Sequence, residues 1–157
     1  MRISTVLALL TFGCFISACG GKTEFKISTT DKLPIEGTWK LLSGTLVEKG
    51  VSTVTDYTKD KSFIKIINGT HFAFTTHDLD KGKDSAKASF GSGAGTYTLK
   101  DSTYTEHLEY CTDRQWEGND FSFTITINND TLVQKGVEKI ESAGVDRLNI
   151  EKYVRLK

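Results

Sequence analysis

The sequence predicts an all-β domain, an antiparallel up-and-down barrel of about eight strands. Gly is frequent and only one Pro is present, a composition that favours strands joined by tight turns. Several segments alternate polar and apolar residues, as a strand with one packed face does, and none has the periodicity of an amphipathic helix. About eight such strands are enough to close a barrel whose interior holds side chains or one small ligand.

The first predicted strand begins after Pro34 and is long enough that Gly44 is expected to bend it. Two segments are interpreted as loops, a polar Gly- and Lys-rich stretch over residues 78–93 and a weakly patterned stretch over residues 137–146. The strands are expected at residues 37–47, 52–58, 63–67, 70–74, 95–99, 104–110, 121–127, 132–136 and 148–156.

Asn68-Gly69 predicts a hairpin between the third and fourth of these strands. The Asn-Gly pair favours the two positive φ angles of a type I′ turn, the strongest local hairpin signal. With a two-residue loop, Ile66 lies opposite His71. Both faces of this hairpin carry apolar residues, so the pattern leaves open which face is inside.

The next hairpin, which turns at Asp101-Ser102, separates its two faces clearly. A two-residue loop places Leu99 opposite Tyr104. One face is polar and the other is apolar, the pattern of a strand pair with one wet side. Glu106 is the exception, because it is a carboxylate on the packed face. That face is expected to hold Tyr97, Leu99, Tyr104, Glu106, Leu108 and Tyr110.

The N-terminal residues have the features of a bacterial lipoprotein signal. Arg2 supplies a positive charge, and the apolar run that follows is too short to span a bilayer. The run ends in Ile16-Ser17-Ala18-Cys19, which resembles a lipobox, so cleavage is expected before Cys19 with lipid added to its thiol. The alternative is an ordinary secretory signal that carries chance cysteines.

This interpretation divides the chain into three parts. Residues 1–18 form the signal peptide, residues 19–34 form a flexible tether behind the lipid on Cys19, and residues 35–157 form the barrel. The protein is then expected in the bacterial cell envelope, held by its lipid anchor, and Gly20 favours the outer membrane by resemblance. Cys14 leaves with the signal, so Cys111 is left as a single thiol and no intramolecular disulfide is expected.

Composition and spacing argue against several classes of function. The formal net charge is zero and the basic residues are scattered, which is not the footprint of a nucleic-acid-binding protein. His71, His77 and His107 show no metal-ligand spacing, and no cofactor is implied by any motif. Glu106 and Glu109 fall on opposite faces of their strand, so they form no carboxylate pair for catalysis. An enzyme is therefore not the expected function.

Two short motifs resemble the ends of a calycin barrel. Gly37-Thr38-Trp39 near the start and Tyr153-x-Arg155 in the last strand resemble the signatures of lipocalins and fatty-acid-binding proteins, and the chain resembles bacterial lipocalin-like lipoproteins. The resemblance implies that Trp39 plugs the closed end of the barrel, that Arg155 lies against it, and that Tyr153 faces the cavity or packs beside it. Glu151 stands where fatty-acid-binding proteins carry an anion-binding Arg, which argues against carboxylate recognition there.

A candidate ligand site follows from the packed face and the last strand. If this face lines a wet cavity, its Tyr and Glu side chains suit a ligand with hydrogen-bond donors or a positive charge. The alternative is that Glu106 forms a buried structural ion pair with Lys65 or Arg155. The candidate ligand-binding residues are Tyr97, Tyr104, Glu106, Tyr110, His71, Glu151 and Tyr153.

The expected function is binding of a small amphipathic ligand inside a lipid-anchored barrel. An alternative is an envelope adaptor or assembly protein whose barrel is filled by side chains and whose surface meets a protein partner. A hydrolase or isomerase that uses Glu106 as its base is a third hypothesis, which requires a raised pKa in a solvent-reachable pocket.

Overall fold

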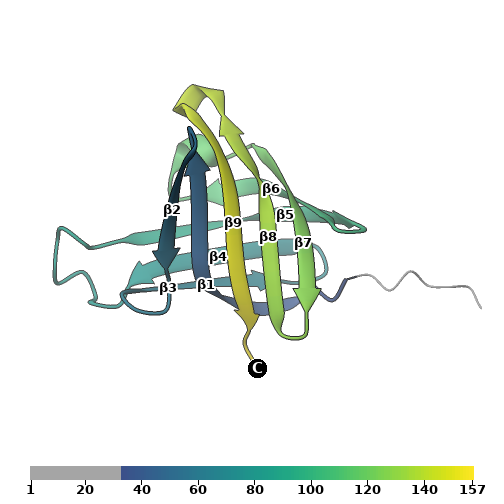
Figure 1. Ribbon diagram of the computed structural model, residues 1–157, viewed down its shortest axis with the longest axis horizontal. Coiled ribbons are helices and arrows are strands. Elements are labelled where there is room, and N and C mark those ends of the chain that lie inside the picture. The colour runs from purple at the N-terminus through teal and green to yellow at the C-terminus, as the bar shows by residue number, and fades with distance from the viewer. Residues whose placement is uncertain (1–32) are drawn as a thin grey trace, which may run out of the picture. The chain divides into compact units, whose positions relative to one another are not determined.

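Nine antiparallel strands and two 3₁₀ helices form the part of the chain that the computed structural model describes, residues 33–157 (Figure 1). The predicted signal peptide, Cys19 and most of the predicted tether lie outside these residues. Neither of the two described helices is long and apolar enough to cross a bilayer. The elements are β1 (Gly37–Glu48), β2 (Val51–Asp56), β3 (Lys61–Ile67), β4 (His71–Asp78), β5 (Phe90–Lys100), β6 (Thr103–Cys111), η1 (Arg114–Trp116), β7 (Asp120–Asn128), β8 (Thr131–Ile140), η2 (Glu141–Ala143) and β9 (Val145–Arg155).

All described strands except β2 close into a barrel of eight. Each strand from β3 to β9 pairs with the next, β1 pairs with β3, and β9 pairs back with β1. In Figure 1, β1 and β7–β9 cross the layer formed by β3–β6. β2 stands outside the closed barrel and pairs with the second half of β1. The predicted all-β, up-and-down barrel is confirmed, with one strand added to it.

β1 changes its neighbour half-way along its length. It pairs with β3 from Gly37 to Lys40 and with β2 from Ser43 onward. Its register with β9 shifts between Leu41 and Ser43, which marks a β-bulge. The sequence predicts a bend at Gly44, which is slightly further along β1 than the observed register shift. From Ser43 onward, β2 lies beside β1 in place of β3. The barrel wall between β1 and β3 is therefore interrupted along the second half of β1.

The β3–β4 hairpin differs from the predicted type I′ turn. Neither Asn68 nor Gly69 has a positive φ angle, and Ile67 lies opposite Phe72, so the predicted pairing is wrong by two residues. The Asn68 side chain explains the shift, because its Oδ1 accepts hydrogen bonds from the backbone N–H groups two and three residues further on. Phe72 is buried inside the barrel, so His71 faces outward.

The β5–β6 hairpin confirms the register predicted at its turn. Leu99 lies opposite Tyr104, and Tyr97 lies opposite Glu106. Asp101 supplies the positive φ angle, 54°, that the short turn requires. Tyr104 and Glu106 are both buried, as the alternation of polar and apolar residues predicts.

A β-bulge further along β6 reverses that alternation. Gly95 lies opposite Leu108 and the preceding residue of β5 lies opposite Tyr110, so Glu109 is the extra residue of β6. Tyr110 is therefore 66 % exposed, and its prediction as a packed residue is wrong. Gly is needed at position 95, because a Cβ there would lie 1.9 Å from the carbonyl oxygen of His107.

β8 and β9 extend into the stretch that the sequence assigns to a loop, residues 137–146. β8 continues to Ile140 and β9 begins at Val145, joined by η2 and by Gly144, which has a left-handed φ of 66°. The loop prediction is wrong because an inward-facing polar residue, Glu138, hides the alternation of a strand. Both strands therefore carry inward side chains well beyond the closed end of the barrel.

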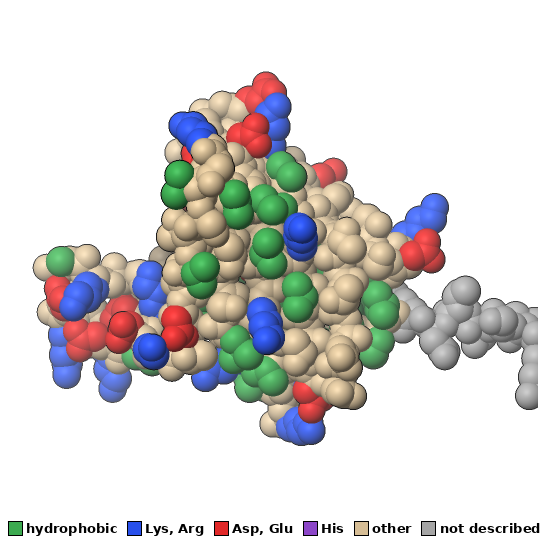
Figure 2. All heavy atoms as spheres, viewed as in Figure 1, with side chains coloured by type: hydrophobic (Ala, Val, Ile, Leu, Met, Phe, Trp, Pro, Cys, Tyr) green, Lys and Arg blue, Asp and Glu red, His purple; other side chains and the backbone are tan. Residues whose placement is uncertain are grey.

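The β4–β5 connection is shorter than predicted and highly charged. It spans residues 79–89, since β4 continues through Asp78 and β5 begins at Phe90, and Figure 2 shows Lys and Asp side chains gathered on it. Asp78 accepts hydrogen bonds from the backbone N–H groups of Gly82 and Ser89. These bonds lower the pKa of the Asp78 carboxyl below its ordinary value and tie the two ends of the connection together.

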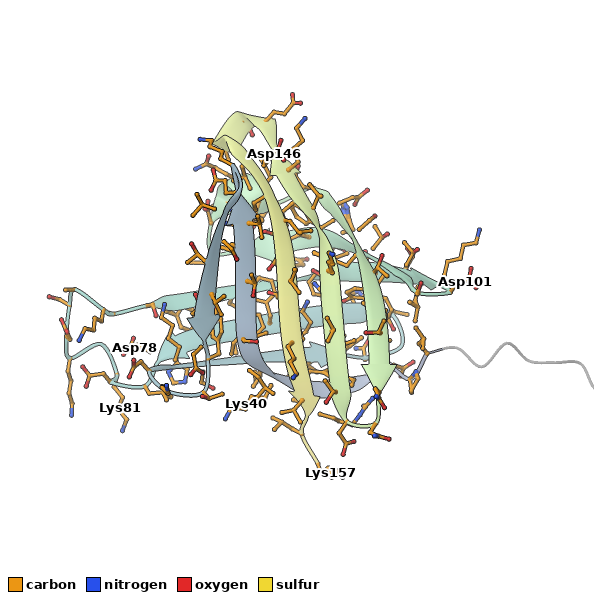
Figure 3. The ribbon with its side chains drawn as sticks, viewed as in Figure 1. Lys40, Asp78, Lys81, Asp101, Asp146 and Lys157 are labelled. Carbon is orange, nitrogen blue, oxygen red and sulfur yellow. The ribbon has the colours of Figure 1, made fainter. Side chains whose placement is uncertain are left out.

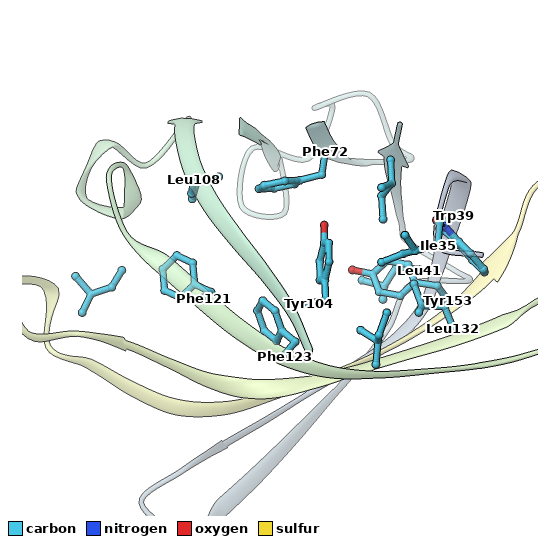
Figure 4. Close-up of a cluster of buried hydrophobic side chains, with 13 residues drawn as sticks. Ile35, Trp39, Leu41, Phe72, Tyr104, Leu108, Phe121, Phe123, Leu132 and Tyr153 are labelled. Carbon is cyan, nitrogen blue, oxygen red and sulfur yellow. The ribbon is translucent and has the colours of Figure 1, made fainter. Parts of the chain in front are cut away.

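The closed end of the barrel is a layer of large buried side chains. Trp39 is fully buried, and its Nε1 donates a hydrogen bond to the carbonyl oxygen of Ile35 at 2.7 Å. The Arg155 guanidinium carbon lies 4.1 Å from the centre of the Trp39 ring, and the guanidinium also donates to two backbone carbonyls of the segment that leads into β1. Figure 4 shows the residues of this layer together, Ile35, Trp39, Leu41, Leu132 and Tyr153.

Gly37 explains why the Gly-x-Trp motif begins with Gly. Its φ angle is 138°, a value that other residues rarely adopt, and a Cβ there would overlap the Arg155 guanidinium. The strand can therefore place Trp39 beneath Arg155 only if the residue two positions earlier has no side chain.

A candidate ligand-binding cavity

The barrel encloses a cavity of about 280 Å³ beyond its closed end. Ligand pockets in proteins span roughly 300–1,000 Å³, so this volume suits a small molecule. The cavity is lined by parts of β8 and β9 toward Asp146, and by parts of β3 and β4 toward Asp78, two positions labelled in Figure 3. Its side chains form a polar layer, a cluster at the rim and an apolar wall.

Four side chains, Lys65, Glu106, Gln134 and Glu151, form the polar layer next to the closed end. Each lies two positions from a closed-end or other buried residue of its own strand, as Gln134 does from Leu132 in β8. The period of two in a β-strand therefore carries the barrel interior from the apolar closed end directly to this polar layer. The residues come from four different strands, and barrel closure brings them together.

Lys65 and Glu106 form a buried ion pair within the polar layer. The Lys65 Nζ lies 2.7 Å from Glu106 Oε1 and 3.2 Å from Gln134 Oε1. Burial alone would lower the pKa of Lys65, but the carboxylates of Glu106 and Glu151 outweigh it, and the pKa is raised. Lys65 is therefore a cation in the barrel interior, already paired with a carboxylate.

Glu151 holds a different position, because it has no cationic partner among residues 33–157. Its Oε2 accepts a hydrogen bond of 2.7 Å from the Tyr153 hydroxyl, and no ion pair is formed by its carboxylate within the described chain. Burial, the charge of Glu151 and this hydrogen bond all raise the pKa of Tyr153 well above its ordinary value. Tyr153 is thus a neutral donor that fixes one oxygen of Glu151.

The rim cluster consists of Trp116, Glu138, Arg147 and Asn149. Arg147 Nε and Asn149 Nδ2 each donate to a separate oxygen of Glu138 at 2.7 Å. The Arg147 guanidinium carbon lies 5.0 Å from the centre of the Trp116 ring, within range of a cation–π contact. Burial raises the pKa of Glu138, and this effect exceeds the opposing influence of Arg147 and Asn149.

Aromatic and aliphatic side chains form the apolar wall of the cavity. Phe63 and Phe74 stack with ring centres 5.5 Å apart, and Trp116 packs against Phe121 at the same distance. These pairs place flat, rigid apolar surface next to the polar layer. The wall consists of Leu46, Tyr57, Phe63, Phe74, Leu108, Trp116, Phe121 and Phe123.

The structure brings some of the predicted site residues to the cavity and leaves others beside it. Glu106 and Glu151 line the cavity, and Tyr153 lies directly beneath Glu151 at the closed end. Tyr104 is fully buried next to the polar layer, and its hydroxyl has no hydrogen-bond partner within residues 33–157. Burial, followed by the charge of Glu106, raises the pKa of that hydroxyl. The Tyr97 hydroxyl instead donates to a backbone carbonyl of the β3–β4 turn.

Two predicted ligand residues lie on the outside of the barrel. Tyr110 faces solvent because of the bulge at Glu109, and Cys111 lines the cavity in its place. His71 is exposed, and its Nδ1 lies 2.7 Å from the Thr70 hydroxyl. Both positions are therefore corrected. No group of three or more potential metal ligands is present within residues 33–157.

Sequence reasoning missed several residues that line the cavity. Arg147 and Asn149 continue the inward alternation of the predicted residues Glu151 and Tyr153 along β9, and Gln134 and Glu138 lie at inward positions along β8. The period-two signal was present, but polar residues at inward positions resemble a solvent face. Trp116 belongs to a short helical turn after β6, which carries no strand pattern.

Among solved structures, the chain is similar to a lipocalin-like protein. No protein-family model matches the chain, and no curated protein matches it. A crystal structure of a lipocalin-like protein from Bacteroides uniformis ATCC 8492 is similar, with a TM-score of 0.49 and 15 % sequence identity over 77 % of this chain and 97 % of that chain. The described chain has a lipocalin-like fold. Its strand order, the closure of its barrel and the contact of Trp39 with Arg155 at the closed end carry this assignment.

Proposed function

We propose that this protein binds a small amphipathic molecule inside its barrel and is held in the bacterial cell envelope by lipid on Cys19. The cavity supports the first half of the proposal, because an apolar wall faces a layer of polar groups within one space of about 280 Å³. Sites of this kind, mostly apolar with a few placed polar groups, are typical of small-molecule binding. Eight-stranded barrels are wide enough to hold one such ligand.

A cavity-filling substitution tests ligand binding. Leu108 is buried and lines the cavity, so Leu108→Trp is expected to weaken binding of the neutral fluorescent probe N-phenyl-1-naphthylamine at least tenfold. Ile66→Trp is the matched control, because Ile66 is 49 % exposed on strand β3 and the same side chain would point to solvent. The measurement is probe fluorescence on residues 19–157 carrying Cys19→Ser, with probe excitation outside the Trp absorption band.

Thermal unfolding shows whether Leu108→Trp folds. If it does not, Leu46→Trp is the alternative cavity-filling variant, because Leu46 is half-buried near the end of β1 and also lines the cavity. Equal probe affinity in the filled variants and in wild type would contradict binding in the cavity. An absence of probe binding to wild type, together with native mass spectra free of any bound species, would point to a side-chain-filled barrel.

Metabolic labelling with palmitate tests the lipid anchor. Cys14 lies within the predicted signal peptide and Cys19 directly follows it, and only Cys19 comes after the Ile16-Ser17-Ala18 run that resembles a lipobox. Cys19→Ala is expected to abolish incorporation of the label and release the protein from the membrane fraction, whereas Cys14→Ala should change neither. Label retained in Cys19→Ala would overturn the proposed anchor on Cys19. Separately, fractionation of cells that express the wild-type protein tests whether it lies in the outer membrane.

The second candidate, an envelope adaptor that acts through its surface, is favoured by β2. This strand pairs on one side with β1, its other edge is unpaired within the described chain, and Val51 and Val54 are 67 % and 66 % exposed. Unpaired edges can accept a strand from a partner. A photocrosslinker at Thr53 should then yield one stoichiometric adduct in cells, while one at the exposed Thr126 of β7 should not. Identical patterns from both positions would remove this candidate.

A further inference from the structure

The polar layer and the rim cluster together hold three carboxylates and two cations, and we propose that the cavity selects ligands that carry a protonated amine, with Glu151 as the counter-ion. This inference rests on the proposed ligand-binding function and names the chemical class of the ligand. It depends on the pairing of charges inside the barrel, on the aromatic rings around Glu151 and on the size of the cavity.

Within the polar layer and the rim cluster, each cation forms an ion pair with a carboxylate, and Glu151 is the carboxylate without such a partner. Lys65 is 2.7 Å from Glu106, and Arg147 is 2.7 Å from Glu138. Both cations that line the cavity therefore already have carboxylate partners, and a ligand anion would have to break one of these pairs. Glu151 forms no ion pair within residues 33–157, and its carboxylate accepts a hydrogen bond from the neutral Tyr153 hydroxyl. A cation is thus the ligand group that this cavity can accept without losing an existing pair.

The field of Glu151 extends across the cavity. Its negative charge contributes to the raised pKa values of Tyr57, Lys65, Glu138 and Tyr153, which come from four different strands or connections around it. In each case a negative charge nearby favours the protonated form of the group. The same field would favour a protonated amine over its neutral form.

One aromatic residue contacts the same carboxylate, and two more line the same cavity. Tyr153 donates its hydroxyl to Glu151, and the Phe63 ring lies 6.1 Å from the Tyr153 ring and 6.0 Å from the Tyr57 ring. Rings of this kind attract ammonium groups through their faces, by roughly 0.5–2 kcal/mol each according to the degree of desolvation. A carboxylate flanked by aromatic rings is a combination suited to a cation and unsuited to an anion.

The remaining space determines the apolar part of the ligand. The wall at Leu108, Phe121 and Phe123 lies on β6 and β7, within the same cavity of about 280 Å³. This volume is at the lower end of ligand pockets. A short chain with one ring or one branched alkyl group, ending in an amine, fits both the size and the distribution of polar groups.

Three probes with one skeleton and three charges test the inference. Isothermal titration calorimetry of residues 19–157 with Cys19→Ser compares 4-phenylbutylamine, 4-phenylbutanol and 4-phenylbutyrate. The amine is expected to bind at least tenfold more tightly than the alcohol, and the carboxylate to bind more weakly than both. Glu151→Gln should reduce the affinity for the amine at least tenfold, to the level of the alcohol, while changing the affinity for the alcohol by less than twofold.

Asp146→Asn is the matched control, because Asp146 is an exposed carboxylate on the same strand, β9, and should leave the preference for the amine unchanged. Glu151→Asp, which keeps the charge, should retain a preference for the amine and covers the case in which Glu151→Gln fails to fold.

The outcomes separate this inference from the function on which it rests. Equal affinity for the three probes, or an amine preference that survives in Glu151→Gln, would overturn charge selection and leave ligand binding standing. Binding of N-phenyl-1-naphthylamine without any binding of the amine would do the same. Failure of all four probes would overturn both.

Discussion

Glu106→Gln is expected to lower the free energy of unfolding by about 3–5 kcal/mol, because it removes one partner of a buried ion pair and leaves the other charged. The side chains of Lys65 and Glu106 are only 3 % and 8 % exposed, so water cannot replace the lost carboxylate. The remaining neighbour of the Lys65 Nζ, the Gln134 side-chain oxygen at 3.2 Å, is neutral. Urea denaturation followed by circular dichroism measures the loss.

Two further variants show whether the loss comes from the isolated charge. The double substitution Lys65→Met with Glu106→Leu should recover most of the stability, since apolar side chains of similar volume replace a buried ion pair with little net cost. Glu138→Gln should cost less than Glu106→Gln, because its partner Arg147 is 27 % exposed and can reach water. A Glu106→Gln variant as stable as wild type would contradict the structural importance of the pair.

The same variant addresses the two roles that the sequence leaves open for Glu106. A large loss of stability with little change in relative affinity for charged and neutral probes would assign Glu106 to the structure of the barrel. Changed ligand preference at nearly unchanged stability would assign it to the ligand instead. The 2.7 Å contact with Lys65 makes the structural result the expected one.

Trp39→Ala is the second substitution with a large expected effect, a loss of about 3–5 kcal/mol. Trp39 is fully buried, its Nε1 donates to Ile35, and its ring supports the Arg155 guanidinium at 4.1 Å. Truncation would open a void at the closed end and remove the side-chain contact between Trp39 on β1 and Arg155 on β9. The measurement is again the urea midpoint, together with the slope of the transition.

Trp116→Ala is the matched control, since Trp116 is the second Trp of the chain and lies half-buried at the cavity rim. It should lose less than half as much stability as Trp39→Ala and should instead weaken probe binding, because its ring forms part of the apolar wall. Similar losses of stability from the two substitutions would contradict the assignment of Trp39 to the closed end.

Local patterns were enough to predict the fold class and part of its register. Strict alternation in β6 and β7 and a short turn at Asp101 determine which side chains face inward near that turn, and the observed pairing of Leu99 with Tyr104 follows from them. These features depend on residues close together in sequence. The Gly-x-Trp motif and the final-strand Arg add the meeting of the two ends, which the structure shows as the Trp39–Arg155 contact.

Single-residue irregularities limited the prediction of the site. The extra residue Glu109 turns Tyr110 outward and brings Cys111 inward, because one inserted residue exchanges the two faces of a strand. The Asn68 side chain moves the β3–β4 pairing by two residues, which changes the cross-strand partners but exchanges no faces. Neither irregularity changes the composition or the average periodicity of its segment, so neither is visible until the neighbouring strand is in place.

The sequence by itself therefore determined an all-β barrel, its order of strands and the residues that close one end. Only the tertiary structure decided the contents of the cavity. Lys65 meets Glu106 across 41 positions and Gln134 across 69 positions of the chain. Glu151 is left without an ion pair in the described chain because Lys65 and Arg147 lie against Glu106 and Glu138 instead. Such partners are selected by barrel closure, which brings side chains together from strands that no local pattern connects.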